Sequence, residues 1–152
     1  LRVAQILSVE EHPNADSLYV LKIDDGSPDG RTLCAGLRRH YTKEELLQRK
    51  IILFANLKPA MLRGIESKGM LLAADGADEK PILLEAGENR VGERVLFEGV
   101  TPSEEETTLT LKDFSLVQLI VANGVASIDG MKLCGSAGPI TAPDAPDGAA
   151  IH

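Results

Sequence analysis

A succession of short strand-like segments, separated by turn residues, most constrains what this chain can fold into. Apolar and polar side chains in residues 2–9 follow the two-residue period of a β-strand. The pattern predicts one face with Val3, Gln5, Leu7 and Val9 and the opposite face with Arg2, Ala4, Ile6 and Ser8. The turn residues of 12–16, which include a proline without a backbone donor, end this strand. Further strands are predicted at 18–23, 31–35, 51–55, 69–74, 82–84 and 94–97.

The one clear helix signal follows the third predicted strand. Thr42 and Glu45 have the spacing of a capping box, in which the threonine oxygen accepts from the third helical amide and the glutamate reaches back to the cap amide. Leu46 and Leu47 would then form the apolar side of the helix. Several short strands with one helix at this position are typical of an OB-fold. We therefore expect a mainly β protein, built on a five-stranded OB barrel with one helix.

The last third of the chain differs from the rest in composition. Residues 101–108 are rich in glutamate and threonine and are expected to form a solvated linker. Residues 109–121 and 125–134 have strand character, and the remaining segment is rich in Gly, Ala, Pro and Asp. We accordingly divide the chain into a barrel at 1–100 and a small β-rich appended subdomain at 101–152.

Net charge at first argues against a nucleic-acid partner. The formal charge of the chain is −7, whereas association with nucleic acid normally begins in a positive field. The charge is unevenly spread, however. Residues 31–68 hold nine lysines and arginines against three glutamates, a net +6, while residues 101–152 hold two lysines against seven acids, a net −5. A local basic surface is therefore possible, although charges scattered around a barrel would give the same totals.

No catalytic or metal-binding constellation is visible in the sequence. The histidines His12, His40 and His152 lack metal-ligand spacing, and no glycine-rich phosphate loop is present. We expect no enzymatic activity, no metal and no cofactor. Cys34 and Cys134 are expected to be unpaired thiols of a cytoplasmic protein. No apolar run approaches the roughly 20 residues of a membrane span, and Leu1 suggests a piece of a longer protein.

Residues 56–70, between two apolar strands, carry the chemistry of a site that reads a nucleic-acid backbone. Lysine and arginine side chains can bind phosphate, and amide and hydroxyl groups can bind base edges or ribose. A methionine at the end of the segment could offer apolar surface to an unstacked base or could belong to the core. The candidate residues are Asn56, Lys58, Arg63, Ser67, Lys68 and Met70.

This segment resembles the Asn-Leu-Lys-Pro…Arg-Gly…Ser-x-Gly-Met signature of tRNA-binding domains of the endothelial monocyte-activating polypeptide II type. Residues 12–20 match the His-Pro-x-Ala-Asp-x-Leu segment of the same family. The resemblance implies an OB barrel that occurs at the carboxy terminus of some methionyl- and tyrosyl-tRNA synthetases, in synthetase cofactors and in small bacterial dimers. It places RNA contacts at Asn56, Lys58, Arg63, Ser67 and Met70, and the basic neighbours Arg38, Arg39 and Lys68 complete the predicted RNA-binding set.

The predicted function is that of a non-catalytic module that reads tRNA structure rather than sequence and delivers tRNA to an aminoacyl-tRNA synthetase, in cis or in trans. The resemblance also implies a monomer whose appended subdomain imitates a dimer interface. Met61, where many members have lysine, and Glu66 lower the expected affinity for phosphate. Two alternatives remain: a protein-interaction scaffold of a multi-synthetase complex with weak RNA binding, and a cytokine-like released fragment. With three Phe, two Tyr and no Trp, a general single-strand binder is disfavoured.

Overall fold

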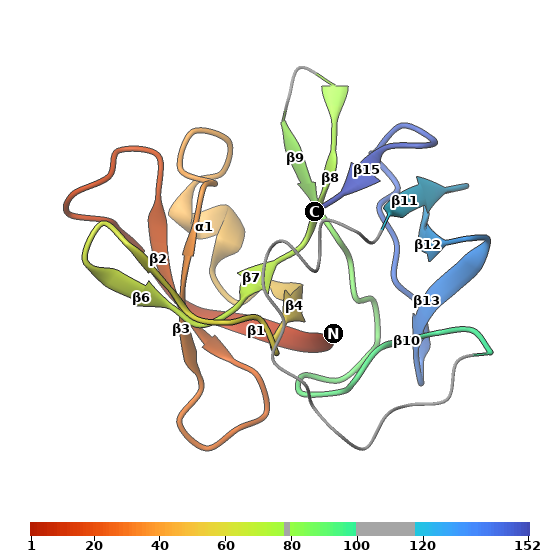
Figure 1. Ribbon diagram of the computed structural model, residues 1–152, viewed down its shortest axis with the longest axis horizontal. Helices are drawn as coiled ribbons and strands as arrows, with labels where there is room; N and C mark the ends of the chain where they lie inside the picture. The colour runs from red at the N-terminus through yellow and green to blue at the C-terminus, as the bar shows by residue number, and fades with distance from the viewer. Residues whose placement is uncertain (78–79, 100–117) are drawn as a thin grey trace.

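The computed structural model describes residues 1–77, 80–99 and 118–152. Its first sheet has five antiparallel strands in the order β3-β2-β1-β4-β7. These strands span Arg2–Glu11 (β1), Tyr19–Asp24 (β2), Arg31–Ala35 (β3), Lys50–Phe54 (β4) and Met70–Leu71 (β7). A two-stranded hairpin of Ala60–Leu62 (β5) and Ile65–Ser67 (β6) stands between β4 and β7. Figure 1 shows this part of the molecule beside a second sheet.

Two hydrogen bonds bring the ends of the first sheet together. The amide of Lys68 donates to the Thr32 carbonyl at 2.9 Å, and the Ser67 hydroxyl accepts from the amide of Cys34 at 3.0 Å. The sheet is thus a nearly closed five-stranded barrel. The one helix of the described residues, α1 (Lys43–Leu46), lies between β3 and β4. The predicted OB-type barrel with one helix is confirmed.

The helix is shorter than its sequence signal suggests. The capping box is present, with both Thr42–Glu45 bonds formed. Leu46 is fully buried, but Leu47 is 48% exposed. The expectation that both leucines form the apolar side is therefore wrong for Leu47. The cause is local, because the helix ends at Leu46 and Gln48 has a φ of 66°, which turns the chain toward β4.

The first strand has the two predicted faces as far as Ile6 and departs from the prediction after it. Val3, Ala4 and Ile6 are all buried, since Val3 packs into one apolar cluster while Ala4 and Ile6 pack into another. A register shift between Ile6 and Ser8 marks a β-bulge at Leu7, which is 47% exposed. Alternation fails only from the bulge onward, because the inserted residue places Val9 against the cluster of Ala4 and Ile6 rather than that of Val3.

The second sheet joins segments from both halves of the sequence. Its order is β10-β13-β12-β11-β15-β8-β9, with β14 paired to β13. The strands are Ala73–Asp75 (β8), Pro81–Leu83 (β9), Leu96–Phe97 (β10), Leu119–Ala122 (β11), Val125–Ile128 (β12), Met131–Gly135 (β13), Gly138–Pro139 (β14) and Ala150–Ile151 (β15). The strand predicted at 125–134 is in fact two strands, because Asp129 and Gly130 both have positive φ and form a turn. Strands on either side of the predicted boundary at residue 100 share this sheet.

Each sheet has its own apolar core, and β4 contributes to both. Ile51 and Leu53 face the barrel interior, whereas Ile52 and Phe54 face the second sheet. This arrangement explains the continuous apolar run in β4. The predicted burial of Leu119 and Val121 is confirmed, while the predicted burial of Leu116, the linker at 101–108 and the strand portion at 109–117 lie outside the described residues. Cys34 and Cys134 are free thiols, as expected.

Candidate nucleic-acid interface

The segment predicted to be a basic loop contains the β5–β6 hairpin. Ala60 pairs with Ser67, Met61 with Glu66 and Leu62 with Ile65. Two residues, Arg63 and Gly64, form its tip with φ values of 53° and 90°. A two-residue turn with positive φ at both positions matches the twist of antiparallel strands. The basic segment is consequently a defined hairpin with Arg63 at its end.

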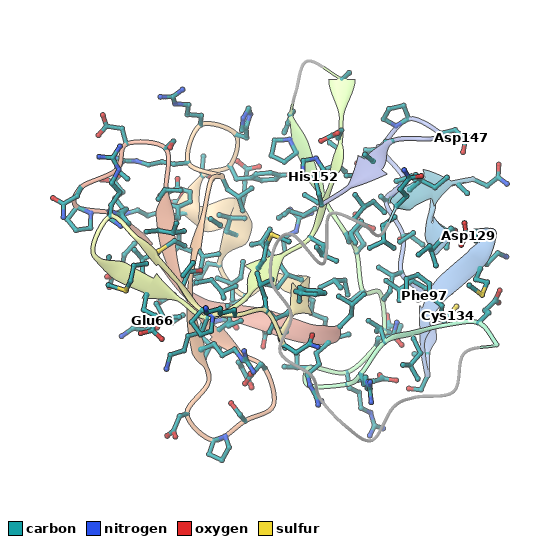
Figure 2. The ribbon with its side chains drawn as sticks, in the orientation of Figure 1. Glu66, Phe97, Asp129, Cys134, Asp147 and His152 are labelled. Carbon is teal, nitrogen blue, oxygen red and sulfur yellow. The ribbon has the colours of Figure 1, made fainter. Side chains whose placement is uncertain are left out.

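The two faces of this hairpin differ in exposure. Met61 and Glu66, which are cross-strand partners, are exposed, and Met61 has 64% of its surface accessible. On the opposite face Ser67 is buried and Leu62 and Ile65 are half-buried. Figure 2 shows Glu66 on the barrel side of the molecule, away from the second sheet that carries Phe97 and Cys134. One hairpin face therefore packs on the barrel while the other is accessible.

A buried histidine ties the hairpin to the other segment that matched the family. His12 is 3% exposed, and its Nε2 lies 2.9 Å from the Leu62 carbonyl. Its Nδ1 accepts the amide proton of Asn14 at 3.0 Å. Because a backbone amide can only donate, Nδ1 is unprotonated and Nε2 carries the proton that is donated to Leu62. His12 thus holds residues 12–18 against β5, and the two sequence signatures meet in space.

A shallow hollow, which we call the hairpin hollow, opens where these segments meet. It is lined by residues 15–18, Arg39 and 61–63 and encloses about 450 Å³. Arg39 and Arg63 are exposed and, within the described part of the chain, form no side-chain hydrogen bond or ion pair. The Asp16 carboxylate lines the same hollow without an ion pair to either arginine, and the two guanidinium groups can bind phosphate in a bidentate manner.

The remaining predicted cations fall into two groups. Lys58 and Lys68 are exposed, and their ammonium groups have no ion-pair partner among the residues that are described. Arg38 instead forms an ion pair with Glu11 at 3.2 Å. Other basic residues counted in the +6 segment serve the fold: Arg31 binds Asp25, and Lys50 donates to the Asn89 carbonyl at 2.8 Å. The excess positive charge available to a ligand is therefore concentrated around the hairpin.

Three uncharged members of the predicted set lie deeper. Ser67 is 5% exposed, and its hydroxyl accepts from Cys34 and donates to the Gly69 carbonyl at 3.3 Å. Met70 is half-buried and packs against the core shared with the second sheet, and Asn56 is half-buried. Ser67 and Met70 are thus placed to support the hairpin, because their functional groups face the protein.

Sequence reasoning missed a group that fixes the base of the hairpin. Arg31 donates through Nε to Asp25 at 2.6 Å and through Nη1 to the carbonyls of Ala55 at 2.7 Å and Lys68 at 3.3 Å. Burial alone would raise the pKa of Asp25, but hydrogen bonds from Ser27 and Arg31 outweigh burial and lower the pKa. The charge total of residues 31–68 includes Arg31 and therefore overstates the positive charge that is available to a ligand.

Comparison with known proteins decides the family. Residues 1–94 match the family described as "Putative tRNA binding domain". The chain belongs to this family of tRNA-binding domains. Methionine–tRNA ligase of Thermococcus onnurineus is 50% identical over 95 residues, which cover 62% of this chain and 13% of the ligase. Methionine–tRNA ligase of Borrelia duttonii is 37% identical over 139 residues, which cover 88% of this chain and 19% of the ligase. The tRNA-binding domain therefore spans about a fifth or less of these curated relatives.

Solved structures extend the likeness to the second sheet. The C-terminal domain of Plasmodium vivax p43 is 33% identical, has a TM-score of 0.84 and matches 99% of this chain and 94% of its own. The CsaA chaperone protein of Picrophilus torridus is 29% identical with a TM-score of 0.55 and covers 60% of this chain and 86% of its own. The relationship of this tRNA-binding domain to p43 thus includes both sheets, whereas the likeness to CsaA covers a smaller part.

The described residues contain neither a cluster of metal ligands nor a membrane-spanning helix. No group of three or more His, Cys, Asp or Glu side chains there could hold a metal ion. In the same residues no helix is long and apolar enough to cross a membrane.

Proposed function

We propose that this domain binds tRNA through the hairpin hollow and the exposed face of β5–β6, without chemistry of its own, and presents the tRNA to an aminoacyl-tRNA synthetase. The observation that carries the proposal is the conformation of Arg63. It occupies the left-handed region at the hairpin tip, with its side chain exposed and unpaired within the described structure. Arginine is disfavoured in such a turn, whereas its guanidinium group binds phosphate well.

Two other hairpins in the chain provide an internal comparison. The β11–β12 turn has Asn123 and Gly124 with φ values of 52° and 78°, and the β12–β13 turn has Asp129 and Gly130 with φ values of 49° and 80°. Asn and Asp tolerate the left-handed region, and the pairs Asn-Gly and Asp-Gly are favoured in these turns. For most other residues this conformation costs roughly 1–2 kcal/mol. Of these three hairpin tips, only the one beside the hollow sacrifices this stability, which supports a functional role for the Arg63 side chain.

The neighbours of Arg63 favour recognition of the RNA backbone. Arg39, Lys58 and Lys68 are exposed cations, and contacts to phosphate position a protein on RNA without reading sequence. A base-stacking platform would need exposed aromatic rings, but of the described rings Tyr19, Tyr41 and Phe54 are buried and Phe97 is half-buried in the second sheet. Recognition of the shape of folded tRNA is therefore the proposed mode.

The family supports a proposal for the partners and the cellular setting of the domain. Its methionine–tRNA ligase relatives are much longer than this chain, and we propose that the domain serves such a synthetase, in cis or as a separate cofactor in a multi-synthetase complex, in the cytoplasm. We further propose that it works as a monomer, with the second sheet occupying the position of a partner subunit. It needs no cofactor for binding.

The decisive variant is Arg63→Asn. Asparagine suits the turn, so thermal stability should stay equal or rise, while tRNA affinity should fall and the log–log salt slope should decrease by roughly 0.7 to 0.9 as one phosphate contact is lost. Gel shift over a salt series, with thermal unfolding in parallel, measures both. The reciprocal control Asn123→Arg should lower stability and leave tRNA affinity unchanged, because this turn belongs to the second sheet.

One observation favours a second candidate function, a protein-interaction scaffold. Glu66 places a negative charge on the exposed hairpin face beside Met61, which weakens the attraction for phosphate. If wild-type protein fails to bind tRNA at low salt, or if Arg63→Asn binds as tightly as wild type, the proposed RNA face is wrong. The scaffold function would then replace it.

A further inference from the structure

A second hollow lies on the β6 side of the hairpin, over the outer face of the barrel. It encloses about 820 Å³ and is bounded by β1, β2, β3, the loop at 27–30 and the end of β6. We call it the outer hollow. Leu7 and Thr32 line it together with charged side chains of both signs, namely Lys22, Arg31, Lys68, Asp24, Asp29 and Glu66. It is separate from the hairpin hollow, with which it shares no lining residue.

The β-bulge supplies the apolar part of the outer hollow. Ile6 pairs with Ile23 and Ser8 pairs with Lys22, so Leu7 is the inserted residue of β1. Leu7 lines the hollow and is 47% exposed, although neighbouring Ile6 is fully buried. Bulges re-aim single side chains at functional sites. Here the bulge turns a leucine from the protein toward solvent, inside a concave surface.

A transverse row of polar side chains crosses the hollow beside Leu7. Lys22 is the cross-strand partner of Thr32, and the amide of Lys68 donates to the Thr32 carbonyl at 2.9 Å. Lys22 and Lys68 therefore lie on opposite sides of Thr32. Among the described residues neither ammonium group has an ion-pair partner. The hollow thus combines an exposed leucine with two ammonium groups that form no direct ion pair, and the carboxylates of Asp24, Asp29 and Glu66 line it as well.

Hydrogen bonds within the protein hold the wall of the outer hollow in place. Arg31, at its edge, joins Asp25 of the β2–β3 loop to the backbone of Ala55 and Lys68. These bonds fix the loop, the end of β4 and the segment after β6 that contains Lys68 relative to one another. A preformed wall lowers the ordering cost of binding.

Resting on the proposed tRNA binding, we propose that the outer hollow receives one unstacked nucleotide of the tRNA, with its base against Leu7 and its phosphate between Lys22 and Lys68. A free phosphate would contact the two lysines but would make no apolar contact with Leu7. A protein partner would need a larger apolar surface than one leucine in a charged hollow. An unstacked nucleotide presents both an apolar base face and a phosphate, and apolar side chains including leucine do pack against bases.

Glu66 gives the outer hollow a preference among bases. Its carboxylate is exposed at the rim and forms no ion pair within the described structure. A carboxylate accepts hydrogen bonds from the exocyclic amino group of cytosine, whereas the O4 of uracil is itself an acceptor and is repelled. Cytosine and uracil are otherwise nearly the same shape. The outer hollow should therefore favour cytosine over uracil.

Binding of short RNAs and of tRNA, measured on the same variants, tests the proposed nucleotide site in the outer hollow. Five-residue oligocytidine and oligouridine, titrated to millimolar concentration, should bind wild-type protein with about a tenfold preference for oligocytidine. Glu66→Gln should reduce that preference without weakening oligouridine binding. Leu7→Ala should weaken binding of tRNA and of both oligonucleotides while leaving the salt slope unchanged. The matched control is Leu47→Ala, because Leu47 is 48% exposed but lies at the end of α1.

The outcomes separate this inference from the proposed function. Equal binding by the Leu7→Ala and Leu47→Ala variants, equal affinity for the two oligonucleotides, or no binding of either at millimolar concentration overturns the nucleotide site. If tRNA binding persists and still depends on Arg63, only the outer hollow inference fails. If wild-type protein binds no tRNA at all, both proposals fail together.

Discussion

One imidazole, that of His12, joins the two stretches by which the family can be recognised. It spans from the amide of Asn14 to the carbonyl of Leu62, 50 positions away in the chain. Buried polar groups are costly when they lose a partner, and here one side chain satisfies two backbone groups. The two segments proposed to bind RNA are therefore held together by a residue that need not touch RNA.

Replacing His12 should expose this supporting role. His12→Ala leaves Leu62 and Asn14 without their partner and should lower the free energy of unfolding by about 1–3 kcal/mol, with a fall in tRNA affinity. His12→Gln retains a donor for Leu62 and should lose less in both measurements. Denaturant titration and gel shift measure the two effects. His40→Ala is the control, since this half-buried imidazole forms no side-chain hydrogen bond among the described residues. Equal stability of the His12→Ala and His40→Ala variants would contradict the role.

At the scale of elements, the β2–β3 loop is held to the hairpin base by the Asp25–Arg31 pair. The pKa of Asp25 is raised by burial and lowered by the hydrogen bonds from Ser27 and Arg31, with a net lowering. A carboxylate whose pKa is lower in the folded state stabilises the fold above its unfolded pKa of about 3.9. That contribution is lost as pH falls through the lower folded pKa.

Acid denaturation should reveal this contribution. Asp25→Asn should be less stable than wild type near pH 7, and the difference should narrow progressively as pH falls from about 5 toward about 2. Denaturant unfolding at a series of pH values measures the difference. Asp29→Asn, an exposed change in the same loop, should show no such convergence. A constant gap between Asp25→Asn and wild type across this range would show that ionisation of Asp25 contributes nothing.

Elements that depend on local signals were predictable from the sequence. Turn residues and side-chain period predict the first four barrel strands and the capping box at Thr42. The single strand predicted at 69–74 is in fact divided between β7 and β8, which lie in different sheets. The β5–β6 hairpin was missed, since its strands are three residues long and its tip, Arg63-Gly64, lacks a favoured turn pair. The turn at Asp129-Gly130 does carry such a pair, and it was overlooked within an apolar run.

The candidate site was only partly predictable for a different reason. Sequence gives the identity of Lys58, Arg63 and Arg39 but not which cations are already engaged. Arg31 and Ser67 look like ligand-binding groups in the sequence, yet both use their polar atoms inside the fold. Leu7 gave no signal, because a β-bulge depends on pairing between strands that are distant in the sequence.

At the scale of the whole molecule, the barrel and the second sheet share one interface. Asn89, which is 1% exposed, donates to Gly138 at 3.1 Å and accepts from Ala137 at 2.8 Å. Glu93 accepts the amide proton of Ser136, and this hydrogen bond lowers the pKa of the Glu93 carboxyl. An apolar core fills the space between the sheets, so the barrel wall on this side is covered by the chain itself.

Removal of residues 101–152 should therefore change the behaviour of the barrel. The deletion uncovers apolar side chains that now lie buried between the sheets, namely Val3, Ile52, Phe54, Leu72, Leu84 and Val95. Exposed apolar patches of this kind drive association. We expect the full chain to be monomeric in light scattering at micromolar concentration and the truncated barrel to dimerise or aggregate. A stable dimer of the full chain would contradict the pseudo-dimer arrangement. A monomeric truncated barrel of unchanged stability would show instead that the second sheet is dispensable to the first, and that the division at residue 100 separates two independent domains.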